Sequence, residues 1–184
     1  MNKSMVCVGL VALVVACGGK TAEAQSPATT SSPTPLVGES GSGGGGTAPA
    51  GRTQMSELEA RRVTDAIKSE IPGHRDRFKS ICGSEVNIEI DWASFGRDME
   101  ALKRLWGNVG VQRLVDAFKH VCVDAAGKSA VKGKVKTIRA INVWDEDKVS
   151  ATLSGGTFTV KLRYGYMPPG MNETDIAGAL IKAL

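Results

Sequence analysis

Hydrophobic and polar residues are arranged in three ways along the chain, and each arrangement predicts a different kind of segment. Residues 5–16 are almost uninterrupted apolar residues, and residues 18–53 are mostly Gly, Ser, Thr, Pro and Ala. Only residues 54–184 show regular amphipathic periods, in which a period near 3.6 indicates a helix and a period of two indicates a strand. We therefore expect a leader, a linker and one globular domain over residues 54–184.

Four stretches of this domain have the period of a half-buried strand. The first alternates four apolar residues with four polar ones, namely Val86, Ile88, Ile90 and Trp92 with Glu85, Asn87, Glu89 and Asp91. Residues 135–144, 149–153 and 158–164 follow the same rule, and Gly155-Gly156 predicts a tight hairpin between the last two. A sheet with apolar residues on one side only is typically covered on that side alone.

Helical periods precede, separate and follow these strands. The first helix begins with a capping box at Ser56 and Glu59 and is expected to end at Pro72-Gly73. The next two cover residues 99–106 and 111–125, with Gly127 as a left-handed cap, and Asn172 caps a final helix. The order α-β-α-α-β-β-β-α predicts an α+β fold. Its sheet is expected to be small and antiparallel, with one strand and a three-strand meander, and helices mainly on one face.

Composition narrows the function classes. The chain has 184 residues, with 23 Lys+Arg against 19 Asp+Glu, so its formal net charge is +4. This charge is far below that of a dedicated nucleic-acid binder, and no nucleic-acid partner is expected. Two His and four Cys are too few for a multi-metal site. No nucleophile motif is present, so we predict no catalytic residues, no metal and no cofactor.

Four residues near the N-terminus resemble the lipobox of bacterial lipoproteins. Lys3 precedes the apolar run, which ends in Val14-Val15-Ala16-Cys17. The run is shorter than the roughly 20 residues that cross a bilayer, so residues 1–16 are interpreted as a signal peptide. The resemblance implies that Cys17 is acylated and anchors the chain. Because Gly18 follows and not Asp, it also implies an outer-membrane lipoprotein facing the periplasm or the cell surface.

A second cleavage site is present downstream. Ala22-Glu23-Ala24 has the small-x-small pattern of an ordinary signal peptidase site, and cleavage before Gln25 would give a soluble secreted or periplasmic protein. With either site, residues 17–53 bury too little apolar surface to fold, and we expect a disordered tether.

Export also bears on the cysteines. Cys7 leaves with the signal peptide, and Cys82 and Cys122 remain in the domain as an even pair. In an oxidising compartment such a pair is usually a structural disulfide. Buried free thiols and a redox pair are the alternatives, and the absence of Cys-x-x-Cys disfavours the redox pair.

Two sets of charged residues are candidate binding residues. The candidate anion-binding residues are Lys132, Lys134, Lys136 and Arg139, which share one side if the segment is extended. Lysines on an edge strand that block edge-to-edge pairing are the alternative. The candidate partner face comprises Glu85, Glu89, Asp91, Lys161 and Arg163, and the acidic members are expected to pair with the basic ones across strands.

These observations lead to one main hypothesis and two alternatives. The main hypothesis is a noncatalytic, lipid-anchored cell-envelope domain that binds or assembles envelope components. Its expected partners are the membrane, through the anchor, and an envelope protein. The alternatives are an anion-binding module for envelope polymers and a small secreted enzyme of unrecognised type. The oligomeric state does not follow from the sequence.

Overall fold

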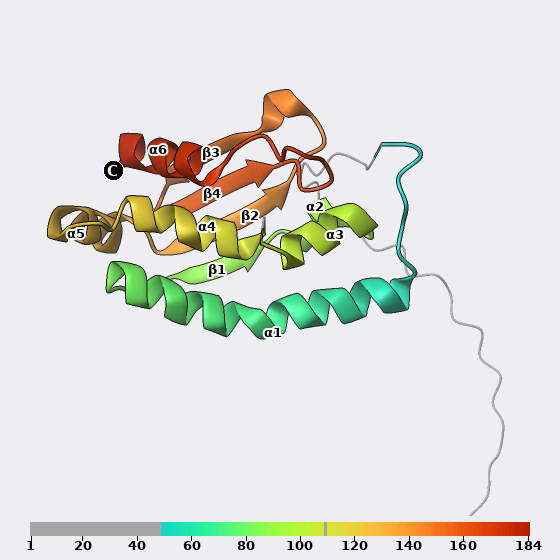
Figure 1. Cartoon of the computed structure of the whole chain (residues 1–184), viewed down its shortest axis with the longest axis horizontal. Coiled ribbons are helices and arrows are strands. Elements are labelled where there is room, and N and C mark those ends of the chain that lie inside the picture. The colour runs from blue at the N-terminus through green and yellow to red at the C-terminus, as the bar shows by residue number, and fades with distance from the viewer. Residues whose placement is uncertain (1–48, 109) are drawn as a thin grey trace, which may run out of the picture. The chain divides into compact units, whose positions relative to one another are not determined.

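Residues 49–108 and 110–184 are described by a computed structural model. Cys17, the expected signal peptide and most of the expected tether lie outside the described residues. In chain order the elements are α1 (Glu57–Cys82), β1 (Asn87–Ile90), α2 (Trp92–Phe95), α3 (Met99–Trp106), α4 (Val111–Ala117), the 3-10 turn η1 (Phe118–His120), α5 (Ala125–Lys134), β2 (Thr137–Asn142), the 3-10 turn η2 (Glu146–Lys148), β3 (Ser150–Ser154), β4 (Thr157–Leu162) and α6 (Glu173–Ala183) (Figure 1).

The four strands form one mixed sheet in the order β1-β2-β4-β3. The α+β class is confirmed, and so is the one-sided covering of the sheet, whose buried side packs against the helices. The expected antiparallel arrangement is wrong, because β1 pairs with β2 in parallel, and β2 pairs with β4 in parallel. Only β3 and β4 are antiparallel. The chain between β1 and β2 runs through α2 to α5, and such a crossover returns the next strand in the same direction.

Helix α1 is longer than expected because it continues through Pro72 to Cys82. A proline inside a helix removes one backbone hydrogen bond, but buried residues on both sides of it hold this helix together. Ile67 precedes the proline and Phe78 follows it, and both belong to the same core. The helix ends at Gly83, whose φ of 70° is the left-handed conformation that favours glycine.

The helix expected over residues 111–125 is in fact interrupted. Helix α4 ends at Ala117, and a separate helix, α5, begins after Asp124, whose side chain accepts a hydrogen bond of 2.8 Å from the N–H of Gly127. Gly127 therefore lies in the first turn of a helix and is not a C-terminal cap. A Cβ at this position would overlap the carbonyl oxygen of Val121, which explains the need for glycine.

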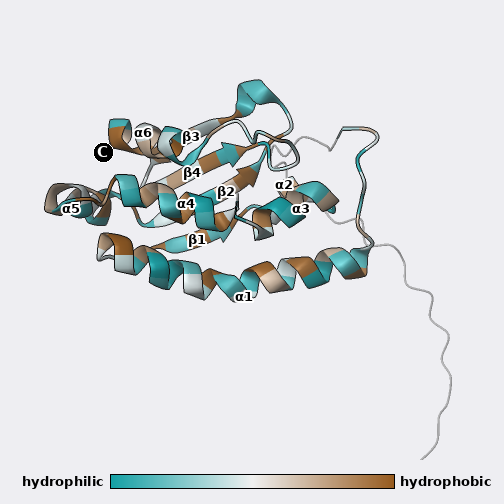
Figure 2. Ribbon diagram, viewed as in Figure 1, coloured by the Kyte–Doolittle hydropathy of each residue, from teal (hydrophilic) through white to brown (hydrophobic). Residues whose placement is uncertain are grey.

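The core lies between the helices and one side of the sheet. Phe118 packs edge-on against Phe78 of α1 and Phe158 of β4, at centroid distances of 4.9 and 5.9 Å. A disulfide joins Cys82 at the end of α1 to Cys122, as predicted. Hydrophobic and hydrophilic stretches alternate along α1 (Figure 2), as expected for a helix with one side on this core. Among the residues described, no helix is both long and apolar enough to span a membrane.

Candidate functional site

The side of the sheet away from the helices is an open face. Its residues alternate with those buried beneath the helices, and they are Asn87, Glu89, Thr137, Arg139, Ile141, Ser150, Thr152, Ser154, Thr157, Thr159 and Lys161. Each is at least partly exposed, whereas the intervening Ile138, Val160 and Leu162 are 0–1% exposed. All of them except Ile141 are polar, so this face suits water or a polar partner.

A row of four residues crosses the middle of the open face. Glu89, Arg139, Thr159 and Thr152 lie side by side on β1, β2, β4 and β3. Glu89 and Arg139 form an ion pair of 3.0 Å in which both side chains are about half exposed, so the pair stabilises the fold by at most about 1 kcal/mol. Threonine hydroxyls donate and accept hydrogen bonds. The row can therefore exchange its contacts with water for contacts with a polar surface at little cost.

The structure divides the candidate partner face. Of its five residues, Glu89 and Lys161 lie on the open face, Glu85 and Asp91 flank β1 at its two ends, and Arg163 follows β4. The expected pairing of the β1 carboxylates with Lys161 and Arg163 does not form, because β2 lies between β1 and β4. Instead, Glu89 pairs with Arg139, and Arg163 pairs with Glu146 at 2.9 Å.

The candidate anion-binding residues are also separated. Lys132 and Lys134 lie on α5, Lys136 lies in the turn before β2, and Arg139 is on the open face, paired with Glu89. The condition for a shared side is not met, because the segment is not extended and the chain is helical up to Lys134. The three lysines are exposed, and Nζ of Lys136 donates a hydrogen bond of 2.8 Å to the carbonyl oxygen of Lys132.

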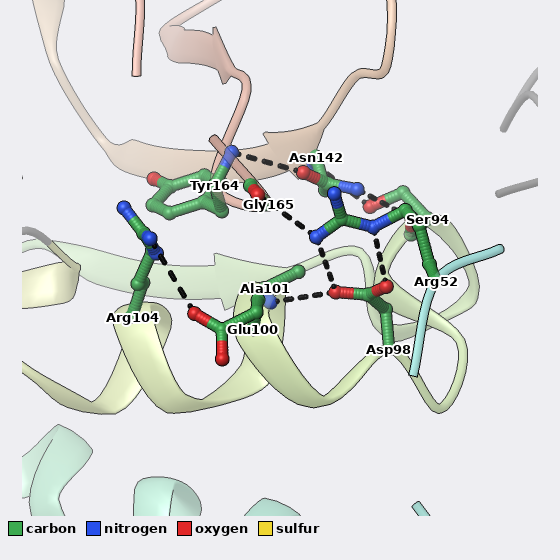
Figure 3. Close-up of polar contacts among 9 residues, drawn as sticks. All are labelled: Arg52, Ser94, Asp98, Glu100, Ala101, Arg104, Asn142, Tyr164 and Gly165. Atoms are coloured by element: carbon green, nitrogen blue, oxygen red, sulfur yellow. Dashed lines mark hydrogen bonds and ion pairs between the residues drawn. The ribbon is translucent and has the colours of Figure 1, made fainter. Parts of the chain in front are cut away.

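A buried polar cluster that sequence reasoning missed lies near the ends of β2 and β4 (Figure 3). Arg52 precedes α1, and its Nε donates to Oδ2 of Asp98 at 2.6 Å, while its Nη2 donates to Oδ1 at 3.0 Å. The same Nη2 donates to the carbonyl oxygen of Gly165 at 2.8 Å. These hydrogen bonds to Asp98 raise the pKa of Arg52. Asp98 is 1% exposed and also accepts the N–H of Ala101, which caps α3.

Aromatic rings enclose the same guanidinium. Its central carbon lies 5.0 Å from the ring centroid of Trp144 and 4.9 Å from that of Tyr166. Arg163 stacks on the Tyr166 ring as well, at 4.2 Å. Cation–π contacts of this kind stabilise by about 0.5–2 kcal/mol. Because both oxygens of Asp98 are engaged by Arg52, we interpret the cluster as a structural clamp on the start of the domain.

A neighbouring set of buried hydrogen bonds joins α2 to the strand ends (Figure 3). The backbone N–H of Asn142 donates to Oγ of Ser94 at 2.9 Å, and its side-chain amide donates to the Ser94 carbonyl oxygen at 3.1 Å. The Asn142 side-chain oxygen accepts the N–H of Tyr164 at 3.1 Å. The Tyr164 hydroxyl is buried and has no partner among the described residues, and this burial raises the pKa of Tyr164. These contacts fix the ends of the strands.

Two titratable groups lie at the contact between α1 and α4. Oδ1 of Asp116 forms ion pairs with Nη2 of Arg77 at 2.8 Å and with Nζ of Lys119 at 3.0 Å. Burial alone would raise the pKa of Asp116, but the hydrogen bonds from Lys119 and Arg77 outweigh it, and the pKa is lower than usual. Partial burial lowers the pKa of His74. Both pKa shifts are explained by the packing of α1 against α4, and neither residue lies on the open face.

Neither a metal-binding group of side chains nor a similar known protein indicates a function for the described residues. Within the part of the chain that is described, no group of three or more His, Cys, Asp or Glu side chains is placed to hold a metal ion. No family model matches the chain, and no curated protein and no solved structure is significantly similar to it.

Proposed function

We propose that this protein is a noncatalytic, lipid-anchored domain of the cell envelope that binds a protein partner through the open face. The observation that carries the proposal is the exposure of a mostly parallel sheet. Parallel strands are normally covered on both faces, but here β1, β2 and β4 are covered by helices on one side only. A partner laid on the open face would complete the usual three layers.

The chemistry of the open face supports a polar interface. Protein interfaces form about one hydrogen bond per 100–200 Å², and the hydroxyls of Thr152, Thr157 and Thr159 supply donors and acceptors on neighbouring strands. Arg139 and Lys161 add positive charge, which Glu89 only partly offsets. A partner with hydroxyl, amide and carboxylate groups is the best match.

An interface variant at the centre of the face tests the proposal. Thr159→Arg places a long charged side chain in the middle row, whereas Thr174→Arg makes the same change at an exposed position on α6. If the denaturation midpoints of both variants match that of the wild type, only Thr159→Arg should lose the proteins that co-purify with the native chain. Equal recovery with both variants would contradict the role of the open face.

The anchor is a separate part of the proposal. It rests on the lipobox resemblance at Val14-Val15-Ala16-Cys17, and intact mass spectrometry of the native protein tests it. A chain that starts at Cys17 and carries acyl groups is expected, with the domain in the outer membrane. An unmodified chain that starts at Gln25 would show a soluble exported protein and overturn the anchor.

Anion binding is a second candidate function, supported by the lysines around α5. Lys128, Lys132, Lys134 and Lys136 are exposed, and none forms an ion pair with a described Asp or Glu. Nζ of Lys134 donates a hydrogen bond to the backbone oxygen of Leu184. Reversing Lys132, Lys134 and Lys136 to Glu should abolish salt-sensitive retention on purified envelope polymers. The matched control reverses Arg61, Arg62 and Lys68 on α1, which changes the net charge equally. Equal retention of both variants would exclude this function.

A further inference from the structure

The free edge of β1 faces α1 across two cavities that follow one another along the strand. One has a volume of about 540 Å³ and is lined by Ile71 together with Ile88, Glu89, Ile90, Asp91, Trp92 and Arg139. The other, of about 470 Å³, is lined by Arg75, Asp76 and Lys79 together with Glu85, Val86, Asn87 and Lys136. We call the two together the edge groove. It overlaps the open face at Asn87, Glu89 and Arg139, and its other side is formed by α1, which runs beside β1 (Figure 1).

Every residue of the chain from Glu85 to Trp92 lines the edge groove. Its other wall is a single side of α1, because Ile71, Arg75 and Lys79 are spaced four residues apart and so lie one above the other on the helix. A groove between a helix and an edge strand is the setting in which an extended peptide adds to a sheet.

On this side, backbone groups of β1 have no hydrogen-bond partner among the described residues. The N–H groups of Asn87 and Asp91 donate to the carbonyl oxygens of Lys136 and Ala140, each at 2.9 Å, so they point toward β2. Because successive residues of a strand point their backbone groups in opposite directions, those of Ile88 and Ile90 point away from β2. These groups are placed to pair with a further strand.

The two ends of the edge groove differ in charge. Arg75, Lys79 and Lys136 gather at the end where β1 begins, and they outnumber the two acidic residues there, Asp76 and Glu85. There, Lys79 is held by Glu85 at 2.8 Å, but both side chains are more than half exposed, so an incoming carboxylate can replace Glu85 at little cost. At the other end, Glu89 and Asp91 outnumber Arg139, and Ile71 and Trp92 offer apolar surface.

We propose that the edge groove binds an extended peptide of a partner protein as an additional strand on β1. The peptide places a carboxylate at Arg75, Lys79 and Lys136 and an aliphatic side chain at Ile71 and Trp92. From Val86 to Asp91 a strand rises about 17 Å, so these two groups are about five residues apart in the peptide. A second copy of this chain is a poor occupant, because pairing β1 with β1 would oppose its own carboxylates, Glu85, Glu89 and Asp91.

The test uses the native protein and a displayed library of random dodecapeptides. Enriched sequences should share an acidic and an aliphatic residue at the stated spacing. A synthetic enriched peptide should shift the amide NMR signals of residues 71–79 and 85–92, not those of 152–159 on the open face. Methylation of alternate backbone nitrogens of the peptide should weaken binding about tenfold, because each removes one hydrogen bond to β1 and leaves a buried group unpaired.

Charge variants complete the test. Arg75→Glu with Lys79→Glu should weaken binding of the enriched peptide about tenfold, whereas Arg61→Glu with Arg62→Glu, at exposed positions of α1 outside the groove, should leave it unchanged. The proposal would be overturned if no peptide sequence is enriched. It would also be overturned if every N-methylated peptide binds as tightly as the unmodified peptide. A change in the groove signals on removal of residues 25–48, or on dilution, would also overturn it, because the occupant would then be the tether or a second copy.

Discussion

Arg52 and Asp98 are 46 positions apart in the sequence, and their side chains meet through two hydrogen bonds of 2.6 and 3.0 Å. Arg52 comes from the segment that enters the domain, and Asp98 caps α3. The contact therefore fastens the first described residues to the helical layer, and folded contacts begin two residues before the expected start of the domain at residue 54.

Removal of Arg52 should be costly. Arg52→Ala leaves the Asp98 carboxylate buried without its cation, and we expect a loss of about 3–5 kcal/mol in the free energy of unfolding. Arg61→Ala, which removes an exposed ion pair with Glu57, should cost less than about 1 kcal/mol. Urea denaturation measures both. The clamp interpretation fails if the two variants are equally stable.

Gly165 should tolerate no side chain. A Cβ at this position would lie 2.5 Å from Nη2 of Arg52 and 2.8 Å from Cζ3 of Trp144, so Gly165→Ala should displace the clamp and lower the thermal midpoint. Gly178 of α6 has open space around it, and Gly178→Ala should stabilise by about 0.5–1 kcal/mol through helix propensity. Thermal unfolding of the two variants should shift in opposite directions, and a shift in the same direction would contradict the packing described.

The disulfide should contribute strongly to stability. Cys82 and Cys122 are 40 positions apart, and closing a loop of that length is worth about 4 kcal/mol in the chain-entropy account. The double variant Cys82→Ala, Cys122→Ala should lose about that amount in guanidinium denaturation. A loss below about 1 kcal/mol would show that the helices hold the two positions together without the bond.

Acid should weaken the contact between α1 and α4. The pKa of Asp116 is lower in the folded chain than the ordinary 3.8, so its ionised form favours folding. This stability is present above pH 3.8 and is lost as the pH falls through the folded pKa. The wild type should exceed Asp116→Asn in free energy of unfolding at neutral pH, and the difference should shrink below pH 3.8. A constant difference would contradict the role of the charge, and exposed Asp65→Asn is the control.

The alternation of buried and exposed side chains along the strands could be predicted from the sequence, because one side of the sheet is buried. Phe158, Val160 and Leu162 are all buried, as their period predicts. The period of two is the same for parallel and antiparallel strands, so it does not predict strand direction. The parallel pairs were missed for this reason. The helices between β1 and β2 were the available signal, since a crossover of this kind joins parallel strands.

Helix α5 was missed for a different reason. Val131 is its only buried residue, so it has no apolar stripe from which to infer a helix. The cap at Asp124 was the one local indication. The Arg52 clamp could not be predicted either, because an arginine in a Gly-rich segment carries no sign of a partner 46 positions away.

The full set of residues on the open face could be identified only from the three-dimensional structure. Glu89 and Lys161 were identified as surface residues from their strand patterns, but Arg139 was grouped with lysines that lie on a helix and a turn. Only the register of β1, β2 and β4 places Glu89, Arg139 and Thr159 in one row.

Photo-crosslinking in living cells tests the central claim most directly. A photoreactive residue at Thr159 on the open face is compared with the same residue at Thr174 on α6. The account predicts one specific protein adduct from position 159 that is absent from position 174. Identical adducts from both positions, or none from position 159 in a folded protein, would contradict the claim that the open face binds a partner.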